Sequence, residues 1–337
     1  MSTPPPIKLA TIADVAAAAN VSRATVSRVM NGLSTVDATI VDRVREAAER
    51  LNYRPSETAR NLSLGRTQTV AVVVPDLGNP MFQAILRGVT RAAAEDGYRV
   101  LVGDTQEQAG AERDAAIEAR RRCDALVLCA PRMDDDSLRD VLATTTPVVI
   151  VNRAVETEAA PQVSADYAHA VGLVIDHLFD LGHRHLIYLG GPLASASNQL
   201  RMSGLDAAEK RYPELRIDRR TVGTGLDDGW SSAETVLESE ASAVVAFNDL
   251  VALGLLSRLR ELGTSVPEQL SVVGVDDIPY SRFSDPSLTT VSMPQDELGI
   301  EAWRRLGLTT HADARNEPLW LEGSLQARES TGPLRKK

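Results

Sequence analysis

The sequence predicts an α/β protein in which a small all-α module precedes a larger region with parallel sheets. Three observations support this prediction. Three helical patterns follow one another between residues 11 and 53, the net charge changes sign after residue 66, and from residue 69 short β-branched runs alternate with longer helical patterns. Alternation of that kind is typical of parallel sheets that helices cover on both faces.

The net charge of −10 is unevenly distributed along the chain. Residues 1–66 carry nine Lys and Arg against six Asp and Glu, a net charge of +3, so the remainder carries −13. A basic segment joined to an acidic body indicates a binding module attached to a domain of another kind. No apolar run reaches the ~18 residues of a membrane span and no secretory signal precedes the helices, so we expect a cytoplasmic protein.

The helices of the first module are expected to begin at capping residues. Residues 1–10, with three consecutive prolines, are predicted to be a disordered tail. Thr11, Ser22 and Asp37 each stand before an apolar periodic stretch, as N-caps do. Only "NV" separates the first two helices, which is the short connection of a helix-turn-helix. The stretch "RPSETARNLSLGRTQT" has little apolar surface and is interpreted as a hinge.

The second region ends several of its predicted strands with an acidic or amide side chain. These residues are Asp76, Asp104, Asn152, Asn248 and Asp276. In open α/β sheets, ligands bind outside the carboxyl ends of the strands, so the pattern predicts a cleft for a polar ligand. Each of these side chains alone could equally be a helix cap. Cys123 and Cys129 are expected to be buried thiols without a disulfide.

The stretch "NVSRATVSRVMNG" concentrates hydroxyls and two arginines on one short helix. A recognition helix needs side chains that read base edges and neighbours that hold phosphates. Arginine can donate two hydrogen bonds to guanine, and short hydroxyls suit phosphate oxygens. A solvated helix face is the alternative, and it would be favoured if the stretch stood alone.

These motifs together resemble the lactose-repressor/galactose-repressor (LacI/GalR) family of bacterial transcription regulators. "TIADVAAAANVSRATVSRVMNG" is similar to the DNA-binding signature of that family and "LNYRPSETARNLSLGRT" to its hinge. "VVVPDLGNPMF", "LGHRHLIYLGGP", "FNDLVALG", "LSVVGVDDIP", "LTTVSMP" and "RESTG" resemble successive landmarks of its core. The chain departs from the family by being short between Gly307 and Pro318 and by a less β-branched last strand.

The resemblance implies an all-α helix-turn-helix headpiece and a two-lobed core like that of periplasmic binding proteins. The headpiece is expected over residues 11–55 and the hinge helix or linker over 56–66. One lobe of the core is expected to take 67–165 and 293–316, and the other 166–292 and 317–330, with three chain crossings between them.

The resemblance also implies which residues contact DNA. Arg23, Ala24 and Arg28 fall on the base-reading positions, and Leu62, with Ala59 beside it, on the minor-groove wedge. Leu62 could alternatively pack the linker on the core. The phosphate-contacting set is expected to comprise Thr11, Ser22, Thr25, Ser27, Asn31 and Thr35.

The effector cleft that the resemblance implies is centred on four residues, Asn152, Arg201, Asn248 and Asp276. Further candidates are Met81, Phe82, Asp166, Trp230 and Asp249. Amides, carboxylates and an arginine beside an aromatic ring suit a sugar, and they suit a nucleoside or purine as well. Neither a cofactor nor a metal is implied, and "HRH" at residues 183–185 lacks further metal ligands nearby.

The expected function is therefore a sequence-specific DNA-binding regulator, a repressor whose operator affinity a small effector controls. A homodimer on double-stranded operator DNA is expected, because the chain ends soon after the core without heptads for a tetramerising bundle. A sugar-binding protein would lack the helix-turn-helix. An α/β enzyme would need a phosphate loop or a catalytic constellation, and neither is evident.

Overall fold

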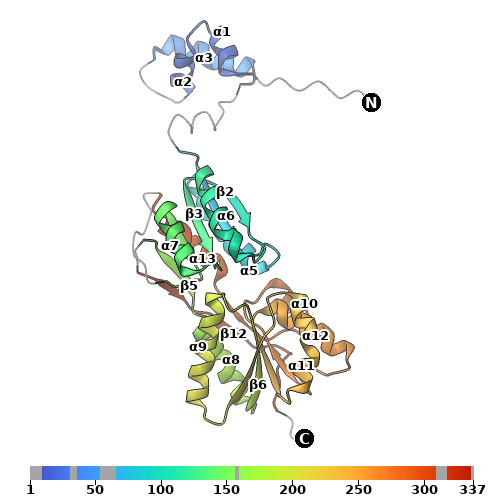
Figure 1. The fold of residues 1–337 in the computed structure, drawn as a ribbon. Helices are drawn as coiled ribbons and strands as arrows, with labels where there is room; N and C mark the ends of the chain where they lie inside the picture. The colour runs from blue at the N-terminus through green and yellow to red at the C-terminus, as the bar shows by residue number, and fades with distance from the viewer. Residues whose placement is uncertain (1–9, 31–35, 54–65, 156–158, 309–316, 335–337) are drawn as a thin grey trace. The chain divides into compact units, whose positions relative to one another are not determined.

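The computed structural model describes residues 10–30, 36–53, 66–155, 159–308 and 317–334. The chain divides into two compact units, Met1–Thr67 and Gln68–Lys337 (Figure 1). Within the described residues, no helix combines the length and the apolar character that a membrane span requires.

The described residues of the first unit form three helices, as the sequence predicts. They are α1 (Ile12–Ala18), α2 (Arg23–Met30) and α3 (Ala38–Arg50). Each expected cap is present: the Thr11 hydroxyl accepts a hydrogen bond in a capping box, the Ser22 hydroxyl accepts one from the Thr25 amide, and Asp37 accepts one from the Thr39 amide. Asn20, at φ 53°, turns the chain between α1 and α2.

The inner faces of these helices form one small core. Val15, Val26 and Val44 are completely buried in it. Their positions on the three helices follow the apolar spacing of the sequence. The predicted tail (1–10) and hinge (56–66) lie outside the described residues, except for the last residue of each.

The first lobe of the second unit is built on a six-stranded parallel sheet with the order β11-β5-β4-β3-β1-β2. Its strands are β1 (Thr69–Val74), β2 (Arg99–Asp104), β3 (Ala125–Cys129), β4 (Val148–Val151), β5 (Gln162–Ala165) and β11 (Leu319–Leu321). Its helices are α5 (Pro80–Glu95), α6 (Ala109–Arg122), α7 (Asp135–Thr144) and α13 (Gln295–Arg305).

Helices cover both faces of the middle of this sheet (Figure 1). Along β1, Val72 faces the core that contains α5 and α13, and Val73 faces the core that contains α6 and α7. Cys123 and Cys129 are buried free thiols, as expected. Coverage is incomplete at β2, where Leu101 and Val102 are 40% and 37% exposed. The expectation that apolar strands are covered on both faces is therefore wrong for β2, because among the described strands it lies at the edge of the sheet and pairs with β1 alone.

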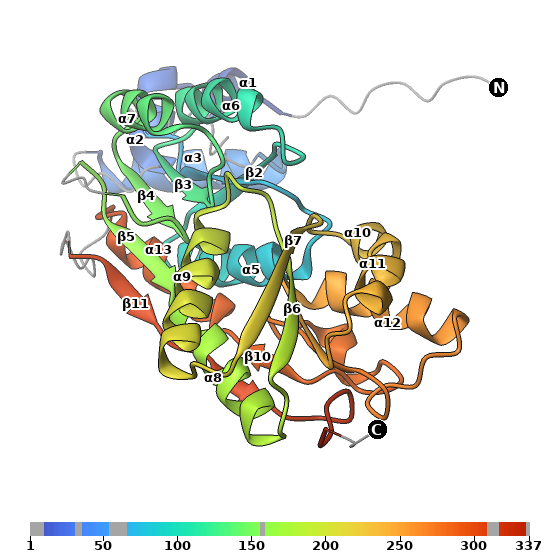
Figure 2. The same cartoon turned by 60° about the horizontal axis from the view of Figure 1, so that its bottom comes forward.

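The second lobe has a four-stranded parallel sheet, order β7-β6-β8-β9. Figure 2 shows β6 and β7 side by side. Its strands are β6 (His185–Gly190), β7 (Arg216–Thr221), β8 (Ala243–Ala246) and β9 (Ser271–Val273). Its helices are α8 (Tyr167–Asp180), α9 (Ala196–Arg211), α10 (Leu226–Ser231), α11 (Ala233–Glu238), α12 (Asp249–Glu261) and the 3₁₀ helix η1 (Pro279–Arg282).

The chain passes between the lobes three times. The first passage follows β5, and the second runs from β10 (Thr290–Ser292) to α13. The third lies between β11, which pairs with β5, and β12 (Ser324–Gln326), which pairs antiparallel with β10. The sequence places this passage at residue 317, whereas β11 keeps residues 319–321 in the first lobe. Strand β11 has only three residues, and they alternate in exposure. It therefore contains no apolar run from which its place in the first-lobe sheet could be predicted.

Candidate functional site

The α2 helix presents the predicted base-reading residues to solvent. Arg23, Ala24 and Arg28 are exposed, while Val26 and Val29 turn inward against the other two helices. This orientation follows from helical spacing, because the buried and exposed residues lie on opposite sides of a 3.6-residue turn. The helix therefore carries two guanidinium groups on a face that is open to a partner.

The predicted phosphate contacts are engaged in local hydrogen bonds. The Ser22 and Thr25 hydroxyls lie 2.9 Å apart and hydrogen-bond each other, and the Thr11 hydroxyl donates to the Asp14 carboxylate at 2.8 Å. Ser27 is half-buried. These bonds fix the start of α1 and of α2, where the helix dipole favours an anion. Four predicted residues lie outside the described part of the chain: Asn31, Thr35, Ala59 and Leu62.

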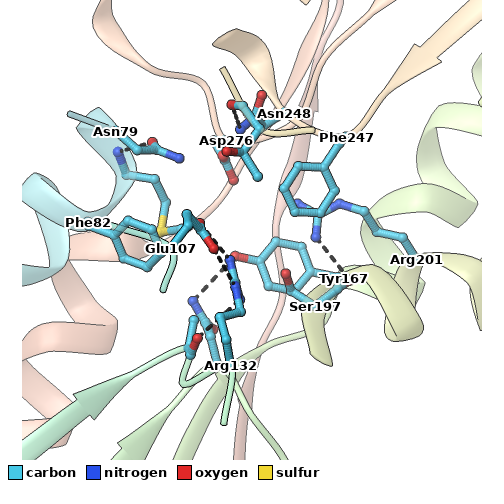
Figure 3. Close-up of a pocket in the computed structure, with 14 residues that line it drawn as sticks. Asn79, Phe82, Glu107, Arg132, Tyr167, Ser197, Arg201, Phe247, Asn248 and Asp276 are labelled. Atoms are coloured by element: carbon cyan, nitrogen blue, oxygen red, sulfur yellow. Dashed lines mark hydrogen bonds and ion pairs between the residues drawn. The ribbon is translucent and has the colours of Figure 1, made fainter. Parts of the chain in front are cut away.

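A cavity lies between the two lobes of the second unit (Figure 3). The first lobe lines it with Asn79, Met81, Phe82, Glu107, Ala130, Arg132 and Asn152, and the second with Tyr167, Ser197, Arg201, Thr224, Phe247, Asn248 and Asp276. Of the five polar residues that the sequence places after strands, Asn152, Asn248 and Asp276 line the cavity, whereas Asp76 and Asp104 are not among the residues that line it. The room left inside it is about 10 Å³, enough for about one water molecule.

Arg201 reaches the cavity from α9 and is 2% exposed. Its guanidinium carbon lies 3.9 Å from the centroid of the Tyr167 ring and 4.4 Å from that of Phe247 (Figure 3). One terminal nitrogen donates to the Ser197 carbonyl at 3.0 Å, whereas no hydrogen-bond partner within the described structure reaches the buried Nε. The two rings hold the cation in place and leave this donor for another molecule.

Asp276 follows β9 and is also 2% exposed. Its Oδ1 atom is buried, and none of the described residues donates a hydrogen bond to it. Burial raises the pKa of this carboxyl to about 8, partly opposed by the positive charge of Arg201. A buried acceptor without a donor is costly, so a ligand that donates to Oδ1 would gain affinity there.

Asn152 follows β4 and has a different role at the same cavity. Its Oδ1 accepts from the Ala165 amide at 2.9 Å, and its Nδ2 donates to the Tyr167 hydroxyl at 3.3 Å. These bonds join the end of β4 to the start of α8, where the chain first passes between the lobes. Asn152 therefore orients Tyr167, the ring that stacks on Arg201.

Asn248 lines the cavity and serves as a helix cap at the same time. Its Oδ1 accepts from the Val251 amide and its Nδ2 donates to the Thr224 carbonyl, both at 2.9 Å. The helix-cap alternative therefore applies to this residue, and its contact with an effector stays a prediction. Its amide has fewer hydrogen-bonding positions left for a ligand than Arg201 or Asp276 has.

Three further candidates do not line the cavity. Asp249 is fully buried beneath it, and its carboxylate accepts from the Ile278 amide, the Ser281 hydroxyl and the Thr290 hydroxyl. Asp166 caps α8 by accepting from the His169 amide. Trp230 lies on α10, is 40% exposed, and contacts the Arg258 guanidinium.

The sequence interpretation missed several residues that line the cavity. Tyr167 and Phe247 supply the ring faces, and Glu107 and Arg132 form an ion pair on the first lobe. Phe247 could have been found, because it directly precedes Asn248 at the end of a strand. Glu107 and Arg132 could not, because each lies in a loop after a strand and nothing in the spacing links them.

The backbone is unusual at the ends of four strands that meet at this cavity. Glu107, Ala130, Asn152 and Asp276 all have positive φ, at 56°, 44°, 56° and 114°. Such conformations cost about 1–3 kcal/mol each for residues other than glycine and concentrate at ligand sites. Four of them around one cavity indicate that the strand ends are shaped for binding.

A helix-turn-helix unit with an exposed arginine face, joined to a two-lobed core with a polar cleft, defines a ligand-responsive DNA-binding protein. Comparison with known proteins agrees. The sequence profile of "Bacterial regulatory proteins, lacI family" matches residues 11–56, and that of "Periplasmic binding protein-like domain" matches residues 175–331. The chain is 31% identical over 299 residues to the HTH-type transcriptional repressor CytR of Escherichia coli K12, covering 87% of each protein.

Solved structures show the same architecture. The lac repressor dimer bound to operator and the anti-inducer ONPF superposes with a TM-score of 0.85 at 28% identity, covering 96% of this chain and 100% of that one. A complex of the regulator CelR with cellobiose gives 0.68 at 28% identity, covering 95% and 99%. The protein belongs to the lacI family of bacterial regulatory proteins. It is a DNA-binding transcriptional regulator under the control of a small-molecule effector.

Proposed function

We propose that the effector is a small, hydroxyl-bearing molecule, a sugar or a nucleoside, bound between the lobes of the core. The observation that carries this proposal is a pair of buried polar atoms, Arg201 Nε and Asp276 Oδ1, to which none of the described residues hydrogen-bonds. One is a donor and the other an acceptor, so a hydroxyl-rich ligand can satisfy both. The rings of Tyr167 and Phe247 add apolar faces, as sugar and base rings require. CelR, a structural relative, is bound to cellobiose.

The test is a thermal-shift screen of sugars and nucleosides with the full chain, repeated with Asp276→Ala. Operators are first selected from random DNA. The variant should lose the ligand response while its operator affinity without ligand stays within about twofold, because none of the described residues donates a hydrogen bond to Oδ1. A variant that kept the ligand response would place the effector elsewhere.

The DNA-reading role is proposed for α2, with Arg23 and Arg28 contacting base edges and Ala24 offering apolar contact. Thr11, Ser22, Thr25 and Ser27 would hold phosphates from the starts of α1 and α2 and from the flank of α2. Asn31, Thr35, Ala59 and Leu62 keep the DNA-contacting roles that the family resemblance gives them. Operator footprinting with single variants would separate base contacts from phosphate contacts.

We also propose that the protein acts as a homodimer on a near-palindromic operator. One headpiece with a single short recognition helix offers few contacts, and two-fold pairing doubles them. The lac repressor, to which this chain is similar, is a dimer on its operator in the matched structure. Light scattering at micromolar concentration should give twice the 36.3 kDa chain mass. A stable tetramer or a monomer would contradict the proposal.

A further inference from the structure

The first lobe closes one side of the cavity with an ion pair between Glu107 and Arg132 (Figure 3). Arg132 Nε donates to one carboxylate oxygen at 2.9 Å and Nη2 donates to the other at 3.2 Å. The side chains are only 5% and 26% exposed, for Arg132 and Glu107 respectively. A two-point contact of this kind fixes both groups, and water screens it little.

The surrounding backbone holds this pair in place. The buried Glu112 carboxylate accepts from the amides of Arg132 and Met133, both at 2.6 Å. On the other side, Gln106 and Glu107 both have positive φ, and the Glu107 amide donates to the Pro75 carbonyl at 2.7 Å. Two consecutive residues in this conformation are costly, so the loop position of Glu107 is maintained by these contacts.

The pairing leaves Arg132 poorly suited to bind an anion. Its Nε and Nη2 donate to Glu107, and its Nη1 donates to the Ala130 carbonyl at 3.1 Å. The Glu107 carboxylate cancels its charge and would repel a second negative group at short range. Arg201 on the opposite lobe differs, because its Nε has no partner among the described residues and no carboxylate pairs with it directly.

We propose that the Glu107–Arg132 pair restricts the effector to molecules without a phosphate or carboxylate on the side that faces the first lobe. This inference rests on the proposed effector cleft and narrows its ligand to an uncharged sugar or nucleoside, as opposed to a phosphorylated one. Hydroxyl or amine donors suit this wall, since each oxygen of Glu107 keeps a lone pair beyond its bond to Arg132.

The first experiment removes the acid and probes the released cation with inorganic phosphate. Glu107→Gln should acquire a saturable thermal stabilisation by phosphate, at constant ionic strength, with affinity at least about tenfold above wild type. Glu118→Gln is the matched control, because Glu118 also pairs with an arginine, Arg122 at 2.6 Å, but on the exposed face of α6. Glu107→Gln combined with Arg132→Gln should lose the gain. Equal phosphate responses in wild type and Glu107→Gln would overturn the inference.

The second experiment uses the wild-type chain and does not depend on a variant folding. Ribose, cytidine and adenosine are compared with their 5′-phosphates by thermal shift. The unphosphorylated member of any pair that binds should bind more tightly, by about tenfold or more. Tighter binding of a phosphorylated member would overturn the inference. If Asp276→Ala then lost that binding, the proposed cleft would still be the binding site. If neither member of any pair binds, the phosphate titration of wild type and Glu107→Gln alone tests the inference.

Discussion

At the scale of single residues, two buried carboxylates beside the cavity differ in how well they are satisfied. Burial raises the pKa of Asp276 to about 8, from an ordinary value of 3.8. The folded chain therefore binds this proton more tightly than the unfolded chain, and the free energy of unfolding falls as pH rises from about 4 to about 8. Asp276→Asn should remove that part of the pH dependence and be more stable than wild type at pH 8. Urea unfolding across this pH range measures both effects.

Asp249 supplies the control for that prediction. Burial also raises its pKa, to about 7, but its carboxylate accepts three hydrogen bonds that oppose the shift. Asp249→Asn should destabilise the core by about 1–3 kcal/mol, because an amide cannot replace both acceptor oxygens. Equal losses of stability in both variants would show that Asp276 is as structural as Asp249.

Arg28 lies on the exposed face of α2 and is predicted to read a base. Arg28→Ala should weaken selected operators by about 1–3 kcal/mol and relax the preference at one base pair in each half-site. Thr25→Ala should instead weaken all sequences more evenly, since a phosphate contact carries no base information. Competition binding against scrambled DNA distinguishes the two. If Arg28→Ala lost the same affinity for operator and for scrambled DNA, Arg28 would not be a base-reading residue.

At the scale of elements, α5 and α13 pack through facing glycines. A Cβ on Gly88 would lie 2.1 Å from the Asp296 carbonyl oxygen, which belongs to the backbone and cannot move aside alone. Gly88→Ala should therefore cost at least about 1–3 kcal/mol. Gly172 on α8 has no atom within 4 Å of its Cβ position, so Gly172→Ala should stabilise the chain by about 0.5–1 kcal/mol. Thermal unfolding of the two variants compares them directly.

The elements that could be predicted from sequence are those with long periodic patterns. The helices of the headpiece and their caps follow from apolar spacing and from Thr11, Ser22 and Asp37. β7 reads "RIDRRT" and has no apolar run, and β11 and β12 have three residues each. Such segments form strands because they pair with neighbouring strands, and their own side chains do not predict a strand.

The residues that line the cavity could likewise be predicted only in part from the sequence. Asn152, Asn248 and Asp276 could be expected there because they end strands, and Arg201 because the chain resembles a known family. Asp249 and Asp166 have the same chemistry and a similar place in the sequence, yet their carboxylates accept hydrogen bonds within the protein. Only the three-dimensional packing distinguishes a carboxylate that holds the fold together from one that is left for a ligand.

At the scale of the whole molecule, the predicted DNA-reading helix and the proposed effector cavity lie in separate compact units of one chain. Control of one by the other is then a coupling free energy between two sites, which thermodynamics requires to be reciprocal. Whatever factor the effector applies to operator affinity, the operator must apply to effector affinity, and a coupling of about 1–3 kcal/mol gives a factor of about 5–150. The four affinities can be measured by titrating effector with and without operator, and operator with and without effector. Glu118→Gln, on the exposed face of α6, should leave both factors unchanged. Unequal factors in the wild-type protein would mean that the effector also binds a second site or changes the oligomeric state.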